Sequence, residues 1–336
     1  MPREIVFPSK GKFACLEYED RTLQPDEVRG PTIASLISPG TEFGWVQGAE
    51  FPIRPGYAAV FKVEEVGTDV TDVEIGEILF CVGYHRQTQQ CSVAYTLKIP
   101  SKIKPEVAVL IRLMGVSMTT LMTTKARTGD KVIVCGAGPV GLLAAHNFLI
   151  GGYDVLIVEP DDLRRKQAEQ SGIPKSLPSM PLDDPEYLGK VSIVLDCSGN
   201  EAAVVDGCKI VRKKGEVVLV GVPWRAQTNL LAHDVLNAVF FNFVELRSGW
   251  EWEIPVLSRD FVWEELLEGY NNSPHNIFGG FQRAMHWLGE SRINLEGLIA
   301  KASPENPTSV YENIQNRTIG EPFVVFDWLR LMVDET

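Results

Sequence analysis

The sequence predicts an α/β protein with two domains, in which a doubly wound parallel sheet accompanies a smaller β-rich domain. Three observations lead to this prediction. The chain has 336 residues, a length that favours about two domains. Roughly its first hundred residues contain short apolar runs broken by turn residues, which is typical of a small β domain. From Lys131 onward, strand-length apolar runs alternate with helix-like segments, which indicates parallel strands with helices on both faces.

The predicted elements follow in chain order. In the β-rich part the predicted strands are VEEVG at 63–67, EILFCV at 77–82 and VAYTLKIP at 93–100, and Pro-Gly pairs at 39–40 and 55–56 mark turns. In the alternating part the predicted strands are VIVC at 132–135, VLIVE at 155–159, SIVLDC at 192–197, EVVLVG at 216–221 and FVEL at 243–246. The predicted helices between them are 139–150, 161–171 and 201–212.

Composition and charge exclude several classes of protein. With 45% apolar and 23% charged residues, the chain is neither collagenous nor disordered. Lys and Arg number 32 against 44 Asp and Glu, and the net charge of −12 disfavours nucleic acid and anionic membrane as partners. The six cysteines show no C-x-x-C spacing, so we expect neither a disulfide framework nor a four-thiolate zinc lobe. Since the N-terminus MPREIVFPSKGKF has no apolar signal core, we expect a cytoplasmic protein.

A glycine-rich motif, GAGPVG, follows the first strand of the alternating part and opens its first helix. Strand, glycine motif and helix in this order are typical of a dinucleotide-binding site, in which the helix N-terminus faces the pyrophosphate. The first glycine permits the tight turn, the second lets the backbone approach the pyrophosphate, and the third lets helix and strand pack closely. The cofactor-binding residues predicted from this motif are Gly136, Gly138, Pro139, Val140 and Gly141.

The next strand ends in Glu159, 23 residues after Gly136, where an acid is expected to bind the ribose hydroxyls. A carboxylate there repels a 2′-phosphate, so the sequence favours NAD over NADP. Arg164, a further candidate cofactor-binding residue, and its neighbour Arg165 argue for the opposite preference. The alternative is that they belong to the mixed-charge run DDLRRKQAE, which is typical of a solvated helix face. The uncharged stretch 132–153 is long enough to span a bilayer, but it contains the glycine motif, so we expect no membrane partner.

Together with four further segments, these motifs make the chain similar to the medium-chain dehydrogenase/reductase family over nearly its whole length. The segments are ISPGTEFGWVQG at 37–48, RPGYAAVFKVEEVG at 54–67, DCSG at 196–199 and GEVVLVGVP at 215–223. The resemblance implies a GroES-like catalytic domain, residues 1–114 and 249–336, interrupted by a Rossmann dinucleotide-binding domain, residues 115–248. It also implies that Ser198, Gly221 and Val222 contact the cofactor. A homodimer is expected to form through the edge strand at Phe243–Arg247.

The zinc ligands of this family are missing from the positions where the resemblance places them. Aligning Thr41 with the motif G-x-C-x-T-D puts Pro39 at the cysteine ligand and Glu42 at the aspartate. Aligning the second motif, G-H-E-x-x-G, puts Tyr57 at the histidine, and the segment RLMGVS has Met114 where the third ligand is expected. Because catalytic zinc prefers Cys and His ligands, we expect no zinc. Among zinc-free relatives, S-P-G-T-E, VGYHRQ and the late Asp-Trp resemble bacteriochlorophyllide a dehydrogenases.

Without zinc, a side chain must take the hydroxyl proton when an alcohol is oxidised. The candidates, expected in the cleft between the domains, are Tyr57, His85, Glu42 and Thr41. A phenol beside the nicotinamide can exchange a proton, a histidine suits proton exchange near neutral pH, a glutamate can act as a base, and the family uses a hydroxyl at the position of Thr41 as a proton relay. The alternatives are structural: a tyrosine that fills the space left by zinc, a loop histidine, a glutamate that holds a loop and a threonine that caps a turn.

The sequence therefore predicts an NAD(H)-dependent oxidoreductase that interconverts a secondary alcohol and its ketone without zinc. A polyol, cyclitol, sugar or specialised metabolite is the expected small-molecule substrate. One alternative is a zinc-free NADPH-dependent reductase of a conjugated double bond or quinone. A second alternative is a catalytically inert nucleotide-binding sensor or scaffold.

Overall fold

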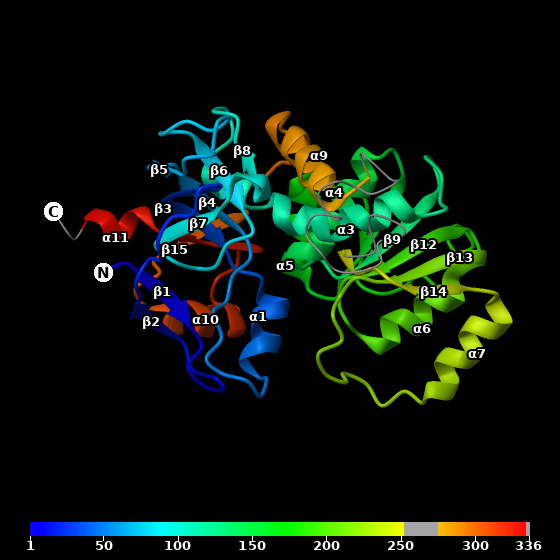
Figure 1. The fold of residues 1–336 in the computed structure, drawn as a ribbon. Coiled ribbons are helices and arrows are strands. Elements are labelled where there is room, and N and C mark those ends of the chain that lie inside the picture. Colours follow the sequence, from blue (N-terminus) through cyan, green and yellow to red (C-terminus); the bar gives the residue numbers. More distant parts are fainter. Residues whose placement is uncertain (252–274, 334–336) are drawn as a thin grey trace. The chain divides into compact units, whose positions relative to one another are not determined.

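The computed structural model describes residues 1–251 and 275–333 and divides the chain into two compact units (Figure 1). The first unit comprises Met1–Arg112, Leu288–Glu290 and Leu295–Thr336, and the second comprises Leu113–Trp287 and Ser291–Asn294. The first boundary lies close to the one expected after residue 114. The second differs from the expected one, because residues 249–251 and 275–287 group with the second unit rather than with the first.

Helix α9 (Ile277–Gly289) accounts for much of this difference, since it packs on α3 (Ile111–Thr123). Phe281 of α9 is 1% exposed and lies so close to α3 that a Cβ on Gly115 would be 2.3 Å from the Phe281 ring. A Cβ on Gly280 would likewise lie 3.2 Å from Met118 Cγ. This contact between distant segments carries no local signal in the sequence.

The first unit is built on short strands and few helices. Its strands are β1 (Arg3–Val6), β2 (Ala14–Glu17), β3 (Glu27–Leu36), β4 (Ala59–Lys62), β5 (Glu65–Val66), β6 (Ile78–Cys81), β7 (Thr88–Ser92), β8 (Thr96–Lys98), β15 (Ile299–Ala302) and β16 (Phe323–Asp327). Its remaining helical elements are α1 (Pro39–Val46), η1 (Val93–Tyr95), α2 (Pro105–Ala108), α10 (Pro307–Gln315) and α11 (Leu329–Val333).

The long strand β3 is the centre of this unit. An eight-stranded sheet has the order β15-β16-β3-β4-β6-β8, and β5 and β7 also pair with β3. Its described pairs are antiparallel except β15 with β16, and β1 and β2 form a separate antiparallel pair. Strand β3 lies very close to the end of β4 at Gly30, where a Cβ would be 1.7 Å from the Lys62 carbonyl oxygen. Only glycine fits this approach.

Local signals in the first unit predict strands better than they predict α1. The run 77–82 contains β6, the run 63–67 contains the short β5, and the run 93–100 divides into η1 and β8. The Pro-Gly pair at 39–40, expected in a turn, instead opens α1. Pro39 occupies the first helical position, where its missing N–H costs no hydrogen bond.

The second unit contains a six-stranded sheet in which every described pair is parallel. The strands are β9 (Lys131–Cys135), β10 (Asp154–Val158), β11 (Ser176–Leu177), β12 (Val191–Asp196), β13 (Val211–Leu219) and β14 (Glu245–Ser248), in the order β11-β10-β9-β12-β13-β14. The strand order reverses between β9 and β12, as in a doubly wound sheet. The predicted α/β fold class is confirmed, although the two-residue strand β11 was not expected.

Helices cover both faces of this sheet. They are α4 (Pro139–Ile150), α5 (Asp162–Ser171), α6 (Glu201–Ile210) and α7 (Ala232–Asn242). Ile133 of β9 packs with Cys208 of α6 and Ala238 of α7 in one buried cluster. Its neighbours in β9 point to the other face, because side chains alternate along a strand, and α4 contacts β9 there (Figure 1).

Within residues 1–251 and 275–333, two apolar stretches are long enough to cross a bilayer, and both belong to the folded protein. Residues 132–153 form β9 and α4. Pro105–Thr123 has the length and hydropathy of a membrane span, and 67% of its most apolar window is buried inside the protein. That degree of burial is typical of a core helix.

Candidate functional site

The glycine-rich loop after β9 has the backbone geometry that its sequence predicts. Gly136 has a φ of +93°, a conformation that glycine adopts without strain. Gly141 packs so tightly that a Cβ on it would lie 1.9 Å from the Gly136 carbonyl oxygen. A Cβ on Gly138 would meet no atom within 4 Å, so the space before α4 is open. Pro139 and Val140 form the first turn of α4, and this open helix N-terminus fits a bound pyrophosphate.

Glu159 lies directly after β10 and faces the glycine loop. Its carboxylate is 5% exposed and accepts hydrogen bonds from the Ala137 N–H at 2.8 Å and the Asp161 N–H at 3.0 Å. The Arg164 guanidinium lies 3.8 Å from the same carboxylate, and Arg165 donates to the Glu159 carbonyl oxygen. Each carboxylate oxygen retains acceptor capacity for a ribose hydroxyl, so the residue fits the predicted role and also holds the loop in place.

The segments after β12 and β13 meet at the carboxyl ends of these strands. Both the N–H and the hydroxyl of Ser198 donate to Asp196 Oδ1, at 2.9 and 2.6 Å, and burial raises the pKa of Asp196. The Gly221 N–H donates to the Asp196 carbonyl oxygen at 2.7 Å, and Val222 is half exposed. A Cβ on Gly136 would lie 3.4 Å from Ser198, so the structure brings Ser198 to the glycine loop. Ligands of doubly wound sheets bind at this end of the strands.

In the first unit, Tyr57 is the centre of a hydroxyl cluster. Its Oη lies 2.5 Å from Ser38 Oγ and 3.3 Å from Thr41 Oγ1. The Arg112 guanidinium stands over the phenol ring, 4.6 Å from the centroid, and Trp45 packs edge-to-face at 5.8 Å. Burial raises the pKa of Tyr57, and the positive charge of Arg112 opposes that effect.

Glu42 and His85 form a separate pair that is completely buried. Glu42 Oε1 lies 3.2 Å from His85 Nε2 and accepts from the Ser38 N–H at 2.8 Å. Glu42 Oε2 accepts from the Tyr311 hydroxyl at 2.5 Å, and burial together with the Glu42 charge raises the pKa of Tyr311 well above its usual value. Glu42 and His85 are each 0% exposed. Three hydrogen bonds therefore satisfy the buried carboxylate.

The other side of His85 is also occupied. Trp328 Nε1–H donates to Ser35 Oγ at 2.8 Å, and Ser35 Oγ lies 2.8 Å from His85 Nδ1. Because the indole can only donate, the Ser35 proton is available for Nδ1, and the network assigns the histidine proton to Nε2, facing Glu42. With both ring nitrogens bonded inside the unit, the geometry of His85 and Glu42 matches their structural alternatives.

Of the four acid/base candidates, the structure brings together Tyr57 and Thr41. Ser38 joins them to the Glu42 pair, since its hydroxyl accepts from Tyr57 and its N–H donates to Glu42. Ser38 and Arg112 were absent from the predicted site. A signal for Arg112 was available, because a single arginine interrupts the apolar run AVLIRLMGV.

The residues at the three expected zinc positions carry no thiolate or imidazole group. Pro39 opens α1, Tyr57 lies in the hydroxyl cluster, and Met114 is a buried thioether in α3. Within residues 1–251 and 275–333, no three His, Cys, Asp or Glu side chains gather so that they could hold a metal ion. All six cysteines are free thiols. The donor set thus does not fit the Cys and His coordination that zinc prefers.

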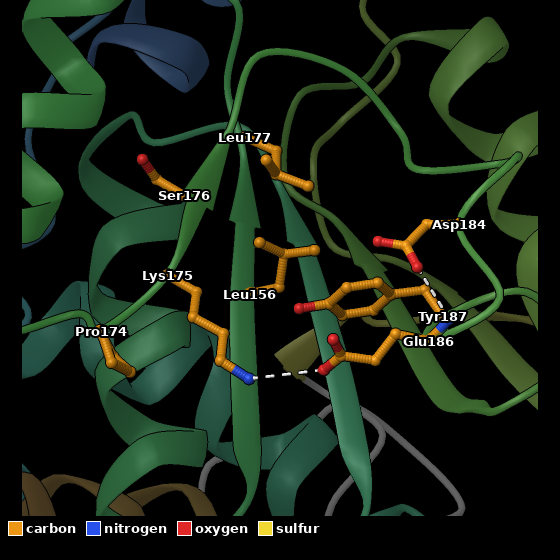
Figure 2. Close-up of a pocket in the computed structure, with 8 residues that line it drawn as sticks. All are labelled: Leu156, Pro174, Lys175, Ser176, Leu177, Asp184, Glu186 and Tyr187. Carbon is orange, nitrogen blue, oxygen red and sulfur yellow. Dashed lines mark hydrogen bonds and ion pairs between the residues drawn. The ribbon is translucent and has the colours of Figure 1, made fainter.

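A hollow of about 420 Å³ lies at the β11 edge of the second unit (Figure 2). Lys175 and Glu186 face each other across it, with Nζ and Oε1 3.8 Å apart. No predicted site residue lines it. The lining residues are Leu156, Pro174, Lys175, Ser176, Leu177, Asp184, Glu186 and Tyr187.

The close packing of the glycine loop predicts two different outcomes for two alanine substitutions. Gly141→Ala should lower the free energy of unfolding of the second unit by about 1–3 kcal/mol, because the methyl group meets backbone that cannot give way. Gly138→Ala is the matched control, since its methyl group meets open space; it should leave unfolding unchanged but weaken nucleotide binding. Urea denaturation measures the stability of both variants, and an unchanged midpoint for Gly141→Ala would contradict the close packing at Gly141.

The buried Glu42 carboxylate predicts a large effect of a single hydroxyl group. Tyr311→Phe should lower the free energy of unfolding by about 1.5–3 kcal/mol, because it removes a hydrogen bond to a buried charge. Tyr153→Phe is the control, since the Tyr153 hydroxyl donates to the neutral Ala126 carbonyl at 3.3 Å and should cost no more than about 1 kcal/mol. Equal losses in urea denaturation would argue against a charged Glu42.

Comparison with known sequences identifies relatives of this chain among dehydrogenases, and no protein-family model matches it. The sorbitol dehydrogenase of Halalkalibacterium halodurans is 30% identical over 132 residues, which are 37% of this chain and 38% of that protein. The putative D-xylulose reductase of Agrobacterium fabrum is 24% identical over 273 residues, 66% of this chain and 77% of that protein. The L-threonine 3-dehydrogenase of Thermococcus kodakarensis is 26% identical over 266 residues, 66% and 74% respectively. The chain thus spans well under half the length of the first of these relatives.

Solved structures share the whole fold. The galactitol-1-phosphate dehydrogenase of Escherichia coli matches with a TM-score of 0.78 and 18% identity over 97% of this chain and 99% of that chain. The acetophenone reductase of Geotrichum candidum, solved in complex with NAD, matches with a TM-score of 0.78 and 13% identity over 97% of both chains. At such identities the likeness to solved structures establishes the fold. The chain is thus similar to zinc-type medium-chain alcohol dehydrogenases, both in parts of its sequence and in its whole fold.

Proposed function

We propose that the chain is an NAD(H)-dependent oxidoreductase that interconverts a secondary alcohol and its ketone, with Tyr57 moving the proton in place of a metal-bound group. The observation that carries this proposal is the Tyr57 hydroxyl cluster, in which a partly buried phenol contacts Ser38 and Thr41 beside the Arg112 cation. Relatives named sorbitol dehydrogenase and D-xylulose reductase support a polyol or sugar as the substrate class.

The choice of NAD rests on Glu159. Its buried carboxylate faces the glycine loop, where a 2′-phosphate would bring a second negative charge. Arg164, 3.8 Å from Glu159, and Arg165, which donates to the Glu159 carbonyl oxygen, are features that favour NADP. The structural neighbours include an acetophenone reductase in complex with NAD and a putative zinc-binding dehydrogenase of Sinorhizobium meliloti bound to NADP, so the fold does not determine the cofactor.

The residues described above define how the proton moves. The bound nicotinamide supplies hydride transfer, and the chain must remove the hydroxyl proton of the alcohol. Tyr57 accepts that proton on Oη as the phenolate and becomes the neutral phenol, whose O–H is directed at Ser38 Oγ. Thr41 Oγ1, 3.3 Å from Tyr57 Oη, orients the phenol. In ketone reduction the same groups return the proton.

Glu42 and His85 act by holding α1 in this scheme. Glu42 accepts from the Ser38 N–H and therefore fixes the residue whose hydroxyl contacts Tyr57. His85 fixes Glu42 in turn, and neither side chain reaches solvent. They are positioning residues for the Tyr57 cluster.

We also propose that two copies of the chain pair along β14. This strand is at one edge of the parallel sheet, and within the described residues it has a strand partner on one side only. Helix α7 exposes Leu236 and Phe240 at 68% and 72%, and Phe243 beside β14 is 60% exposed. Apolar side chains that gather at an open sheet edge are typical of an interface between subunits.

The proposed reaction predicts that Tyr57→Phe retains nucleotide binding and loses turnover. Isothermal titration should show NADH binding to both proteins, with NADPH weaker, because Tyr57 is not part of the glycine loop. Turnover of a panel of polyols and sugars with NAD should fall about 10²–10⁴-fold in Tyr57→Phe, the range typical of lost general acid/base catalysis.

The control for this experiment is Tyr153→Phe, which should leave turnover unchanged. Equal turnover in wild type and Tyr57→Phe would remove Tyr57 from the mechanism. Tighter binding of NADPH than NADH, with reduction of conjugated ketones or quinones, would favour the alternative reductase. Absence of turnover on every substrate would favour a nucleotide sensor.

The proposed pairing predicts that Phe240→Asp dissociates the protein. Sedimentation should give wild type twice the mass of one chain and the variant the mass of one, because a buried unpaired charge opposes association. Leu163→Asp is the matched control, since Leu163 is a 53% exposed leucine on α5. A monomeric wild type would contradict the proposal.

A further inference from the structure

Arg112 is a cation enclosed almost completely by the protein. It is 7% exposed and lies in α3 between Ile111 and Leu113, which are themselves buried. Its guanidinium carbon is 4.6 Å from the centroid of the Tyr57 ring, within the range in which an aromatic face attracts a cation. Burial of a charge is costly unless specific interactions offset it. The stacked phenol is one such interaction, and it links the cation to the proposed proton carrier.

We propose that Arg112 is a positioning residue that supplies, through the Tyr57 ring, the fixed positive charge that proton transfer at this hydroxyl needs. This inference rests on the proposed function. The segment RLMGVS, which the family resemblance aligns with a zinc ligand, begins with Arg112. A permanent side-chain cation thus comes from the same stretch of chain that supplies a metal ligand in zinc-dependent members.

The local charges support this role. Burial is the larger influence on Tyr57 and raises its pKa, which would hold the phenol neutral and make it a poor acceptor of the substrate proton. Arg112 lowers that pKa, while the Glu42 carboxylate, a smaller influence, raises it. These two are the charged groups that act on Tyr57 among the described residues. Ser38 and Thr41 contribute hydrogen bonds that stabilise the phenolate.

The chemistry of arginine suits the task better than that of lysine. A guanidinium keeps its charge at every pH at which a tyrosine titrates, and its planar face stacks on an aromatic ring. A lysine would lose its charge in the same alkaline range, since its ordinary pKa is about 10.4. During alcohol oxidation the O–H bond of the substrate breaks, its proton passes to Tyr57, and the hydride leaves carbon for the nicotinamide. The positive charge stabilises the Tyr57 phenolate, which must be present to accept that proton.

The test is the ionisation of Tyr57 itself, measured without turnover. The phenolate absorbance of wild type minus Tyr57→Phe isolates the titration of Tyr57, and the same difference in an Arg112→Gln background isolates the effect of the cation. We expect the midpoint to rise by about 1–3 pH units in Arg112→Gln. Arg112→Lys should show a smaller rise. Arg29→Gln is the control, because Arg29 pairs with Glu65 elsewhere in the same unit and should cause no shift.

Turnover measured on the same proteins separates this inference from the proposed function. For alcohol oxidation with NAD, the rise of kcat/KM with pH should move to higher pH in Arg112→Gln, and Arg112→Lys should recover part of the difference. An unshifted Tyr57 titration in both Arg112 variants would overturn the inference even if wild type oxidises alcohols. A shifted titration in a protein without turnover would support the coupling of Arg112 to Tyr57 and refute the proposed function. Where Arg112→Gln fails to fold, by circular dichroism, Arg112→Lys alone decides.

Discussion

The buried carboxylate of Glu42 is the constraint on which the first unit depends. A charge that is 0% exposed must be fully hydrogen-bonded, because an unpaired buried charge costs several kcal/mol. Its partners are Ser38, the residue that precedes α1, His85 in the segment after β6, and Tyr311 in α10. One carboxylate therefore joins three stretches of the chain. The Tyr57 cluster is held because Ser38 belongs to both networks.

Much of the second unit is predictable from sequence, because its signals are local. Each apolar run from 132 to 246 falls on or next to a parallel strand, and the glycine motif encodes a backbone shape directly, down to the positive φ of Gly136. The two-residue β11 was missed because so short a strand carries no periodicity. The position of α9 was missed because Phe281 packs against Gly115, which is far away in the sequence, and no local pattern predicts such a contact.

The candidate site was predictable in part. Family motifs led to Tyr57 and Thr41, and the structure brings them together. They also led to Glu42 and His85 as separate proton carriers, whereas the two are each other's partners across 43 positions of the chain. Such a pairing depends on the fold, and no spacing between residues in the sequence predicts it. The burial of Arg112 beside Tyr57 is a consequence of tertiary packing of the same kind, although an arginine in an apolar run signals a special role.

The central claim is that a side-chain hydroxyl moves the proton with no metal ion, and metal removal tests it most directly. Turnover of an alcohol substrate with NAD is measured before and after exhaustive chelation, with zinc added back to the stripped protein. The account predicts unchanged turnover after chelation and no gain from zinc. Turnover that disappears on chelation and returns with one zinc ion per chain would contradict it.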